Sequence, residues 1–164
     1  MSRHHAQGFT LTEILIVIVI VSILATLAVP SYRNYVMRTN RTVAKAALQE
    51  LVTRQESYAV DHKRYAADFA RLGISGSGDA DVAYVTTDGA ISRNAANALY
   101  QFTLAGTEDT ISDCSHGGEV TALAFTLMAT PVAASTDTVC GNLCISSGGV
   151  RGASIGTATD CWKR

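Results

Sequence analysis

The sequence predicts a protein of the α+β class, in which one long N-terminal helix packs on a small antiparallel β-sheet with a disulfide-stapled C-terminal region. Three observations predict this class. A long apolar run near the N-terminus is followed by apolar residues at helical spacing. Short segments rich in β-forming residues come next. All four cysteines lie in the last third of the chain.

The composition restricts the class of protein further. Of the 164 residues, 48% are hydrophobic and only 16% are charged, which argues against intrinsic disorder. The formal net charge is −1, so no global basic field indicates a nucleic-acid-binding protein. The length suits a single domain of ordinary size.

The apolar run, Ile14–Val29, contains no charged residue and is hydrophobic on every side. This excludes a surface amphipathic helix. As a helix, residues Phe9–Val29 would span about 30 Å, which is the thickness of the hydrocarbon core of a bilayer. A secretory signal peptide is the alternative, but residues 25–28 offer a poor cleavage site. We therefore expect a membrane-spanning helix.

The residues before this run carry a family resemblance. A short basic leader ends at Gly8, and Phe9-Thr-Leu-Thr-Glu13 follows it. Glu13 is a candidate functional residue, because an acid at the centre of a membrane helix costs about 2.5–3.5 kcal/mol. With Pro30 after the apolar run, the pattern resembles the type IV prepilin family.

The resemblance implies a processing and assembly route. A prepilin peptidase would remove residues 1–8 by cutting between Gly8 and Phe9, and would methylate the new amine of Phe9. Residues 9–30 would then form the transmembrane and pilus-core helix. Residues 31–164 would form the periplasmic globular domain, including the amphipathic half of the helix. The freed cation would neutralise Glu13 of an adjacent subunit and so favour one register between subunits. The alternative is that Glu13 only lies in the headgroup layer.

The helical pattern resumes after Pro30, which is expected to kink the helix or loosen one turn. Apolar residues at intervals of one, three and four predict an amphipathic helix as far as about Val60. This stripe comprises Val43, Ala44, Ala47, Leu48, Leu51, Val52 and Ala59. Four cations precede or border it, and we interpret them as a solvated or subunit-facing surface rather than a phosphate site. They are Arg33, Arg38, Arg41 and Lys45.

Strand candidates follow a glycine-rich loop at residues 73–81. They are residues 82–87, 99–104, 120–130 and 143–147. The second alternates, with Tyr100, Phe102 and Leu104 on one face, and Gly148-Gly149 after the last is a hairpin-turn signal. We expect a small antiparallel sheet that covers one face of the helix.

The four cysteines are Cys114, Cys140, Cys144 and Cys161. Four cysteines allow three pairings, and export of this segment would favour disulfides. The C-terminal Cys-Trp and the upstream Cys-Gly-x-Leu resemble PilE-type minor pilins, which implies the bridge Cys140–Cys161. Cys114–Cys144 would then be the second bridge. A zinc site with His116 is the alternative, but the spacing is not the usual C-x2-C.

No catalytic constellation is visible in the sequence. His62 and His116 have no nucleophile in register, so we expect a protein that is not an enzyme and carries no cofactor. We also expect no metal, because Asp79, Asp81 and Asp88 lack the pattern of a calcium loop.

The resemblance implies a structural role. The protein would be a type IV pilus subunit, and a minor pilin in particular, that supports pilus biogenesis, twitching motility, adhesion or DNA uptake. It would be stored in the bacterial inner membrane by a single pass, with its C-terminal domain periplasmic, and then packed by its helix into the extracellular pilus. Its partners would be other pilin subunits, a prepilin peptidase and an inner-membrane assembly platform.

Three alternatives and one conflict stay open. The alternatives are a major pilin, a type II secretion pseudopilin and a DNA-receptor minor pilin. The last would need a basic patch on the globular part, and few cations follow residue 72. Those cations are Arg93, Arg151, Lys163 and Arg164. The conflict concerns orientation: Lys and Arg counts on the two sides of the apolar run favour a cytoplasmic C-terminal part. The leader motif and the cysteines favour a periplasmic one.

Overall fold

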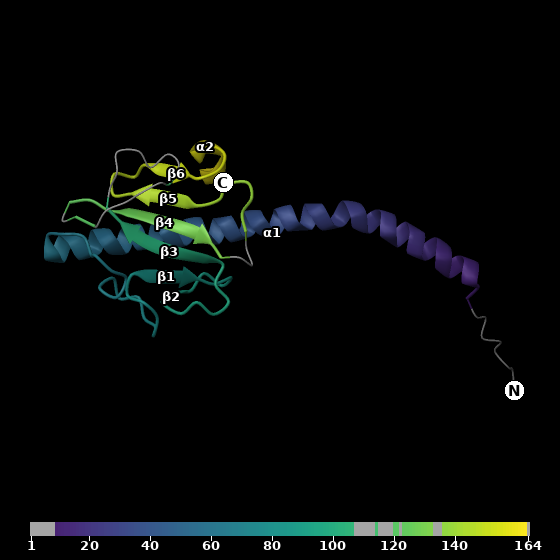
Figure 1. Ribbon diagram of the computed structural model, residues 1–164, viewed down its shortest axis with the longest axis horizontal. Coiled ribbons are helices and arrows are strands. Elements are labelled where there is room, and N and C mark those ends of the chain that lie inside the picture. The colour runs from purple at the N-terminus through teal and green to yellow at the C-terminus, as the bar shows by residue number, and fades with distance from the viewer. Residues whose placement is uncertain (1–8, 107–113, 115–119, 122, 133–135, 164) are drawn as a thin grey trace, which may run out of the picture. The chain divides into compact units, whose positions relative to one another are not determined.

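The computed structural model describes residues 9–106, 114, 120–121, 123–132 and 136–163 (Figure 1). The chain divides into two compact units, Met1–Val36 and Met37–Arg164, and helix α1 (Leu11–His62) contributes residues to both. The leader expected at residues 1–8 lies outside the described residues.

In the first unit, every residue from Phe9 to Tyr35 is exposed, and no residue of its apolar window is buried by the rest of the chain. By length and composition, α1 is the one helix among the described residues that is able to cross a membrane. The hydroxyl groups inside the apolar run bond within the helix itself. Ser22 donates to the carbonyl of Ile18 at 2.7 Å, and Thr26 donates to that of Ile23 at 2.6 Å. The run therefore presents an apolar surface without an unsatisfied hydroxyl.

Helix α1 continues through Pro30. The sequence predicted a kink or a loosened turn there; the helix is continuous through this residue, and the kink stays a prediction. Proline lacks an N–H group, so residue 30 cannot donate a backbone hydrogen bond within the helix.

The second unit contains a six-stranded sheet in the order β2-β1-β3-β4-β5-β6, in which all neighbours are antiparallel. The strands are β1 (Val82–Val85), β2 (Ile91–Ser92), β3 (Tyr100–Ala105), β4 (Thr126–Pro131), β5 (Leu143–Ser146) and β6 (Arg151–Ala153). A short helix, α2 (Ala158–Trp162), follows β6 and lies beside it in Figure 1. The expected antiparallel sheet is therefore confirmed.

Several strand boundaries differ from the prediction. The strand expected at residues 120–130 starts only at Thr126. Before it, the N–H of Thr121 donates to the carbonyl of Ala124, which forms a turn instead of pairing with a neighbouring strand. The first strand ends at Val85, where Thr86 begins a hairpin. Strands β2 and β6 and helix α2 were not predicted, since elements of two to five residues are too short to show a period.

The core lies between the sheet and the part of α1 in the second unit. The predicted stripe is confirmed at its centre, where Ala44, Ala47, Leu48 and Leu51 are buried. They belong to one cluster with aromatic residues of the loop and sheet, among them Phe69, Tyr100, Phe102 and Phe125.

Candidate functional site

The N-terminal end of α1 contains Glu13, the acid singled out in the sequence. Its carboxylate accepts hydrogen bonds at 2.8 Å from both the N–H and the hydroxyl of Thr10. The N–H of Glu13 in turn donates to the Thr10 hydroxyl at 3.3 Å. This reciprocal arrangement is a capping box, which satisfies backbone donors at the start of a helix. Phe9 and Glu13 are both exposed, whereas Gly8 lies outside the described residues.

Arg41 is the first cation of α1 that is partly buried in the second unit. Its guanidinium donates two hydrogen bonds to the carboxylate of Asp137, at 2.7 and 2.8 Å. The side chain of Asp137 is fully buried and that of Arg41 is 11% exposed. The N–H groups of Val139 and Cys140 also donate to Asp137, each at 3.0 Å. Asp137 therefore joins the helix to the turn that precedes β5.

The ion pair of Arg41 and Asp137 shifts the pKa of Asp137 and that of the neighbouring Tyr100. Burial acts to raise the pKa of Asp137, but the hydrogen bonds from Arg41 and from the two backbone N–H groups outweigh it and lower that pKa. The fully buried Tyr100 lies within the electrostatic influence of this pair, and burial and the negative charge of Asp137 raise its pKa. Both effects favour an ionised Asp137 beside a neutral phenol at neutral pH.

Lys45 lies one turn after Arg41 on the same helix. Its ammonium donates to the carbonyls of Lys163 at 2.8 Å and Cys161 at 3.4 Å. Burial lowers the pKa of Lys45, and repulsion from Arg41 and Arg151 lowers it further. The carbonyls belong to the C-terminal end of α2, where a cation is favoured.

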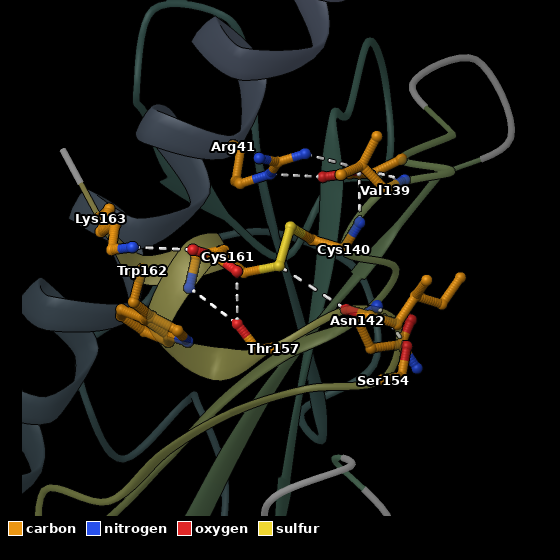
Figure 2. The surroundings of a disulfide bond; sticks show 12 residues. Arg41, Val139, Cys140, Asn142, Ser154, Thr157, Cys161, Trp162 and Lys163 are labelled. Atoms are coloured by element: carbon orange, nitrogen blue, oxygen red, sulfur yellow. Dashed lines mark hydrogen bonds and ion pairs between the residues drawn. A yellow bond between two sulfur atoms is a disulfide. The ribbon is translucent and has the colours of Figure 1, made fainter.

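Two disulfides connect the C-terminal region, Cys140–Cys161 and Cys114–Cys144. The first is the pair that the family resemblance implied, and the second is the pair that then remained. Figure 2 shows Cys140–Cys161 between the turn that carries Val139 and the helix that carries Trp162. Cys140 and Cys161 belong to the core cluster that contacts α1, whereas Cys114 and Cys144 form a separate cluster with Met128.

A surface hollow of about 370 Å³ lies beside α2. It is lined by Arg151, Ala158, Thr159, Trp162 and Lys163. The guanidinium of Arg151 stands 5.0 Å from the centre of the Trp162 ring, and the indole N–H donates to the carbonyl of Gly152 at 2.9 Å. The hollow thus combines an aromatic ring with two exposed cations, Arg151 and Lys163.

The other candidate residues of the sequence form no metal site within the described part of the chain. Among the described residues, no three His, Cys, Asp or Glu side chains are grouped so as to hold a metal ion. The cysteines of the zinc alternative are in disulfides, and its fourth candidate, His116, lies outside the described residues. His62 stacks on Tyr58 at the exposed end of α1, and Asp88 accepts from Thr86 and Ala90 in the β1–β2 turn.

The interpretation of Arg41 and Lys45 as a solvated or subunit-facing surface is wrong, because Arg41 pairs with the buried Asp137 and Lys45 donates to carbonyls at the end of α2. The role of Asp137 was not predicted either. Arg41 and Asp137 lie 96 positions apart, so no local pattern connects them. The Thr10–Glu13 capping box was visible, because Thr-x-x-Glu before an apolar run is its signature. The sequence analysis interpreted Glu13 as a partner for another subunit or, alternatively, as a residue of the headgroup layer, and did not include the cap.

Two family models match the chain. The model described as "Type IV minor pilin ComP, DNA uptake sequence receptor" matches residues 30–144, which is more than half of the chain. The model described as "Prokaryotic N-terminal methylation motif" matches residues 3–29. The two matches adjoin at Pro30.

Individual proteins are similar over shorter segments. The chain is 43% identical over 68 residues to the type IV wide pilus major component PilA4 of Thermus thermophilus. It is 41% identical over 64 residues to the type IV major pilin protein PilA of Myxococcus xanthus. These matches span 42% and 39% of this chain, but only 52% and 29% of the two relatives. A type II secretion system core protein G of Pseudomonas aeruginosa is 37% identical over 65 residues, 40% of this chain and 46% of that protein.

Among solved structures, a type IV pilin from Shewanella oneidensis is similar at a TM-score of 0.44 and 20% identity. The similarity covers 78% of this chain and 99% of that one. The family assignment rests on the two sequence models instead.

Proposed function

We propose a route of membrane storage, processing and assembly for this chain, which belongs to the family of type IV minor pilins described as ComP, DNA uptake sequence receptor. As a member of this family it is a structural subunit of a type IV pilus. The observation that carries the proposal is the exposed apolar half of α1, which has no partner surface within the described residues. A bilayer and then the helices of neighbouring subunits would cover it.

The globular unit faces the periplasm before assembly. The two disulfides support this orientation, because structural disulfides persist in oxidising compartments. The Arg and Lys count opposes this orientation, since Arg33, Arg38 and Arg41 follow the apolar run and only Arg3 precedes it. Protease added to spheroplasts should digest the second unit. Full protection in spheroplasts, with digestion only after lysis, would reverse the orientation.

Processing takes place between Gly8 and Phe9, followed by methylation of the Phe9 amine. The match of residues 3–29 to the methylation motif supports this site. A prepilin peptidase and an inner-membrane assembly platform are the partners that this route requires. Mass spectrometry of the N-terminal peptide from membranes should find methylated Phe9 as the first residue. A first residue other than Phe9 would refute the cleavage site.

A minor role in the filament follows from the family description and is tested by copy number. Sheared pili from the native strain should contain this chain at a small fraction of the principal subunit. A filament made mostly of this chain would identify it as a major pilin. Its absence from filaments, combined with a secretion defect in the deletion strain, would favour a pseudopilin.

DNA binding is a second candidate function, and the hollow beside α2 favours it. A phosphate would contact Arg151 and Lys163, while a base or sugar would lie against Trp162. Lys163 also pairs with Asp160 at 2.8 Å, an exposed contact that an incoming phosphate can replace. The family description supports DNA as the ligand, although the residues of the hollow follow the matched segment.

Trp162 provides a direct probe, because it is the only tryptophan of the chain. Titration of the full chain in detergent with short duplex DNA should quench its fluorescence, and the quench should weaken as salt is raised. Arg151→Gln should weaken binding and reduce the salt slope by about 1. Arg54→Gln is the matched control, because Arg54 pairs with Glu50 and donates to the carbonyl of Leu72, and it does not line the hollow. A titration without salt-dependent change, or equal losses in both variants, would reject this site.

A further inference from the structure

The two disulfides are separated by the sheet. Side chains alternate along β5, so Leu143 and Ile145 join the core cluster against α1, while Cys144 joins Cys114 and Met128 in the other cluster. Met128 and Cys144 are direct neighbours in the β4–β5 register. Cys140, in the turn before β5, belongs to the α1 side with Cys161. Cys140 and Cys144 are only four positions apart, yet each must form its disulfide on a different face of the sheet.

Loop entropy alone does not favour this pairing. The cost of closing a loop grows with its length, so the short loop between Cys140 and Cys144 competes well in an unfolded chain. That wrong bridge would leave Cys114 and Cys161 as the other pair. Some interaction other than proximity along the chain must bring Cys140 to Cys161.

Helix α1 supplies such an interaction on the Cys140 side. Arg41 binds Asp137 through two hydrogen bonds, and Asp137 accepts from the N–H of Cys140 itself at 3.0 Å. The N–H of Gly141 donates to the carbonyl of Asp137 at 2.9 Å and closes the turn. The backbone of Cys140 is therefore held at α1 by contacts that do not involve its sulfur. Figure 2 shows Arg41 reaching from the helix to this turn.

Helix α1 also holds the Cys161 side. Lys45 donates to the carbonyl of Cys161 and, at a shorter distance, to that of Lys163. The N–H of Cys161 donates to the carbonyl of Thr157 at 3.0 Å, so the residue is fixed within α2. Arg41 and Lys45 are four positions apart, which places them on one face of the helix. Each therefore anchors one end of the disulfide.

We propose that Arg41 and Lys45 are positioning residues for oxidation of the chain: they hold the reduced Cys140 and Cys161 segments together, so that this bridge forms in preference to Cys140–Cys144. The reaction is ordinary thiol–disulfide exchange. A disulfide oxidant, such as glutathione disulfide, forms a mixed disulfide with one cysteine and releases one thiol. The thiolate of the other cysteine attacks that bond and releases the second thiol, so two thiols are oxidised and one disulfide is reduced.

The test compares the two disulfides in separate backgrounds of the full chain in detergent. Cys114→Ser/Cys144→Ser leaves Cys140 and Cys161, and Cys140→Ser/Cys161→Ser leaves the other pair. Equilibration with reduced and oxidised glutathione, followed by alkylation and mass measurement, gives the effective concentration of each thiol pair. We expect Arg41→Gln to lower this value at least about tenfold for Cys140–Cys161 and less than about twofold for Cys114–Cys144.

Each other outcome contradicts the proposal. Equal losses in both backgrounds would mean that Arg41→Gln only destabilises the fold, and no loss in either would mean that the ion pair does not position Cys140. Lys45→Met should act on the same pair with a smaller loss, and an unchanged value would remove Lys45 from the mechanism. Arg54→Gln is the control on the same helix and should change neither pair. In the four-cysteine chain, Arg41→Gln should increase the share of molecules with the Cys140–Cys144 bridge.

Discussion

The two halves of α1 belong to one helix, but the apolar side chains of the first half are exposed and those at the centre of the second half are buried in the core. Residues before Val36 leave their aliphatic side chains exposed, with Leu24 at 60%, whereas Leu48 in the later half is fully buried. The charged side chains of the two halves also differ in the range of their contacts. Within the described part of the chain, the Glu13 carboxylate bonds to Thr10 of its own first turn, while the side chain of Arg41 bonds to a residue 96 positions away.

This difference separates assembly from folding. Substitutions in the first half remove contacts that the folded chain does not make by itself, so their effects are expected in the filament. Substitutions in the second half remove contacts within the second unit, and their effects are expected in its stability. The four predictions below test this division.

The largest effect is expected at Glu13. Glu13→Ala should nearly abolish incorporation into filaments, because it removes both the charge and the cap, while the thermal unfolding of the second unit stays unchanged. Glu13→Gln separates the two roles, since glutamine retains a capping box but carries no charge. Immunoblots of sheared pili measure incorporation. Normal incorporation of Glu13→Gln would assign the role to the helix cap and refute the pairing of Glu13 with the Phe9 cation of a neighbour.

The second effect concerns the Arg41–Asp137 pair. Asp137→Ala should lower the free energy of unfolding of the second unit by about 3–5 kcal/mol, because it leaves a partly buried cation without its anion. Denaturant unfolding of the full chain in detergent, followed by near-ultraviolet circular dichroism, measures the loss. Glu50→Ala, which breaks the exposed pair with Arg54, should cost no more than about 1 kcal/mol. Equal losses in the two variants would show that burial does not distinguish them.

The third effect compares two leucines of the same helix. Leu48→Ala should cost about 2–5 kcal/mol, since it removes a fully buried side chain from the core. Leu24→Ala should leave the unfolding of the second unit unchanged, because Leu24 is exposed in the other unit. The same unfolding experiment serves for both. A similar loss at Leu24 would contradict the division between the halves.

The smallest effect is a pH dependence. The pKa of Asp137 is lowered in the folded chain, so the unfolded chain binds the proton more readily. The stabilisation by Asp137 is therefore fully present above its ordinary pKa of 3.8 and is lost as pH falls through the lowered value. Asp137→Asn should be less stable than the native chain at pH 6, and the difference in the free energy of unfolding should narrow below pH 3.8. A difference that stays constant with pH would mean that the charge of Asp137 is not the cause.

Local patterns predicted much of the fold and of the N-terminal site. The period of Ala44, Ala47, Leu48 and Leu51 predicted the buried face of α1, and the alternation at Tyr100 and Phe102 predicted β3. Gly148-Gly149 predicted the turn between β5 and β6, where Gly149 adopts a φ of 77°. The two-residue strand β2 left no such signal. The hollow at Trp162 left no local signal either, since its residues come from β6, from α2 and from Lys163 directly after α2.

The sequence by itself determined the long helix, its apolar first half, the capping box at Glu13 and the set of cysteines available for pairing. These features depend on residues at most a few turns apart, so that periodicity and motif spacing reveal them. Only the tertiary structure decided that Arg41 meets Asp137, that Lys45 meets the end of α2, and that the sheet separates the two disulfides. The reason is physical: strand register and helix packing bring together groups about 100 positions apart, and burial then makes their charges and bonds specific.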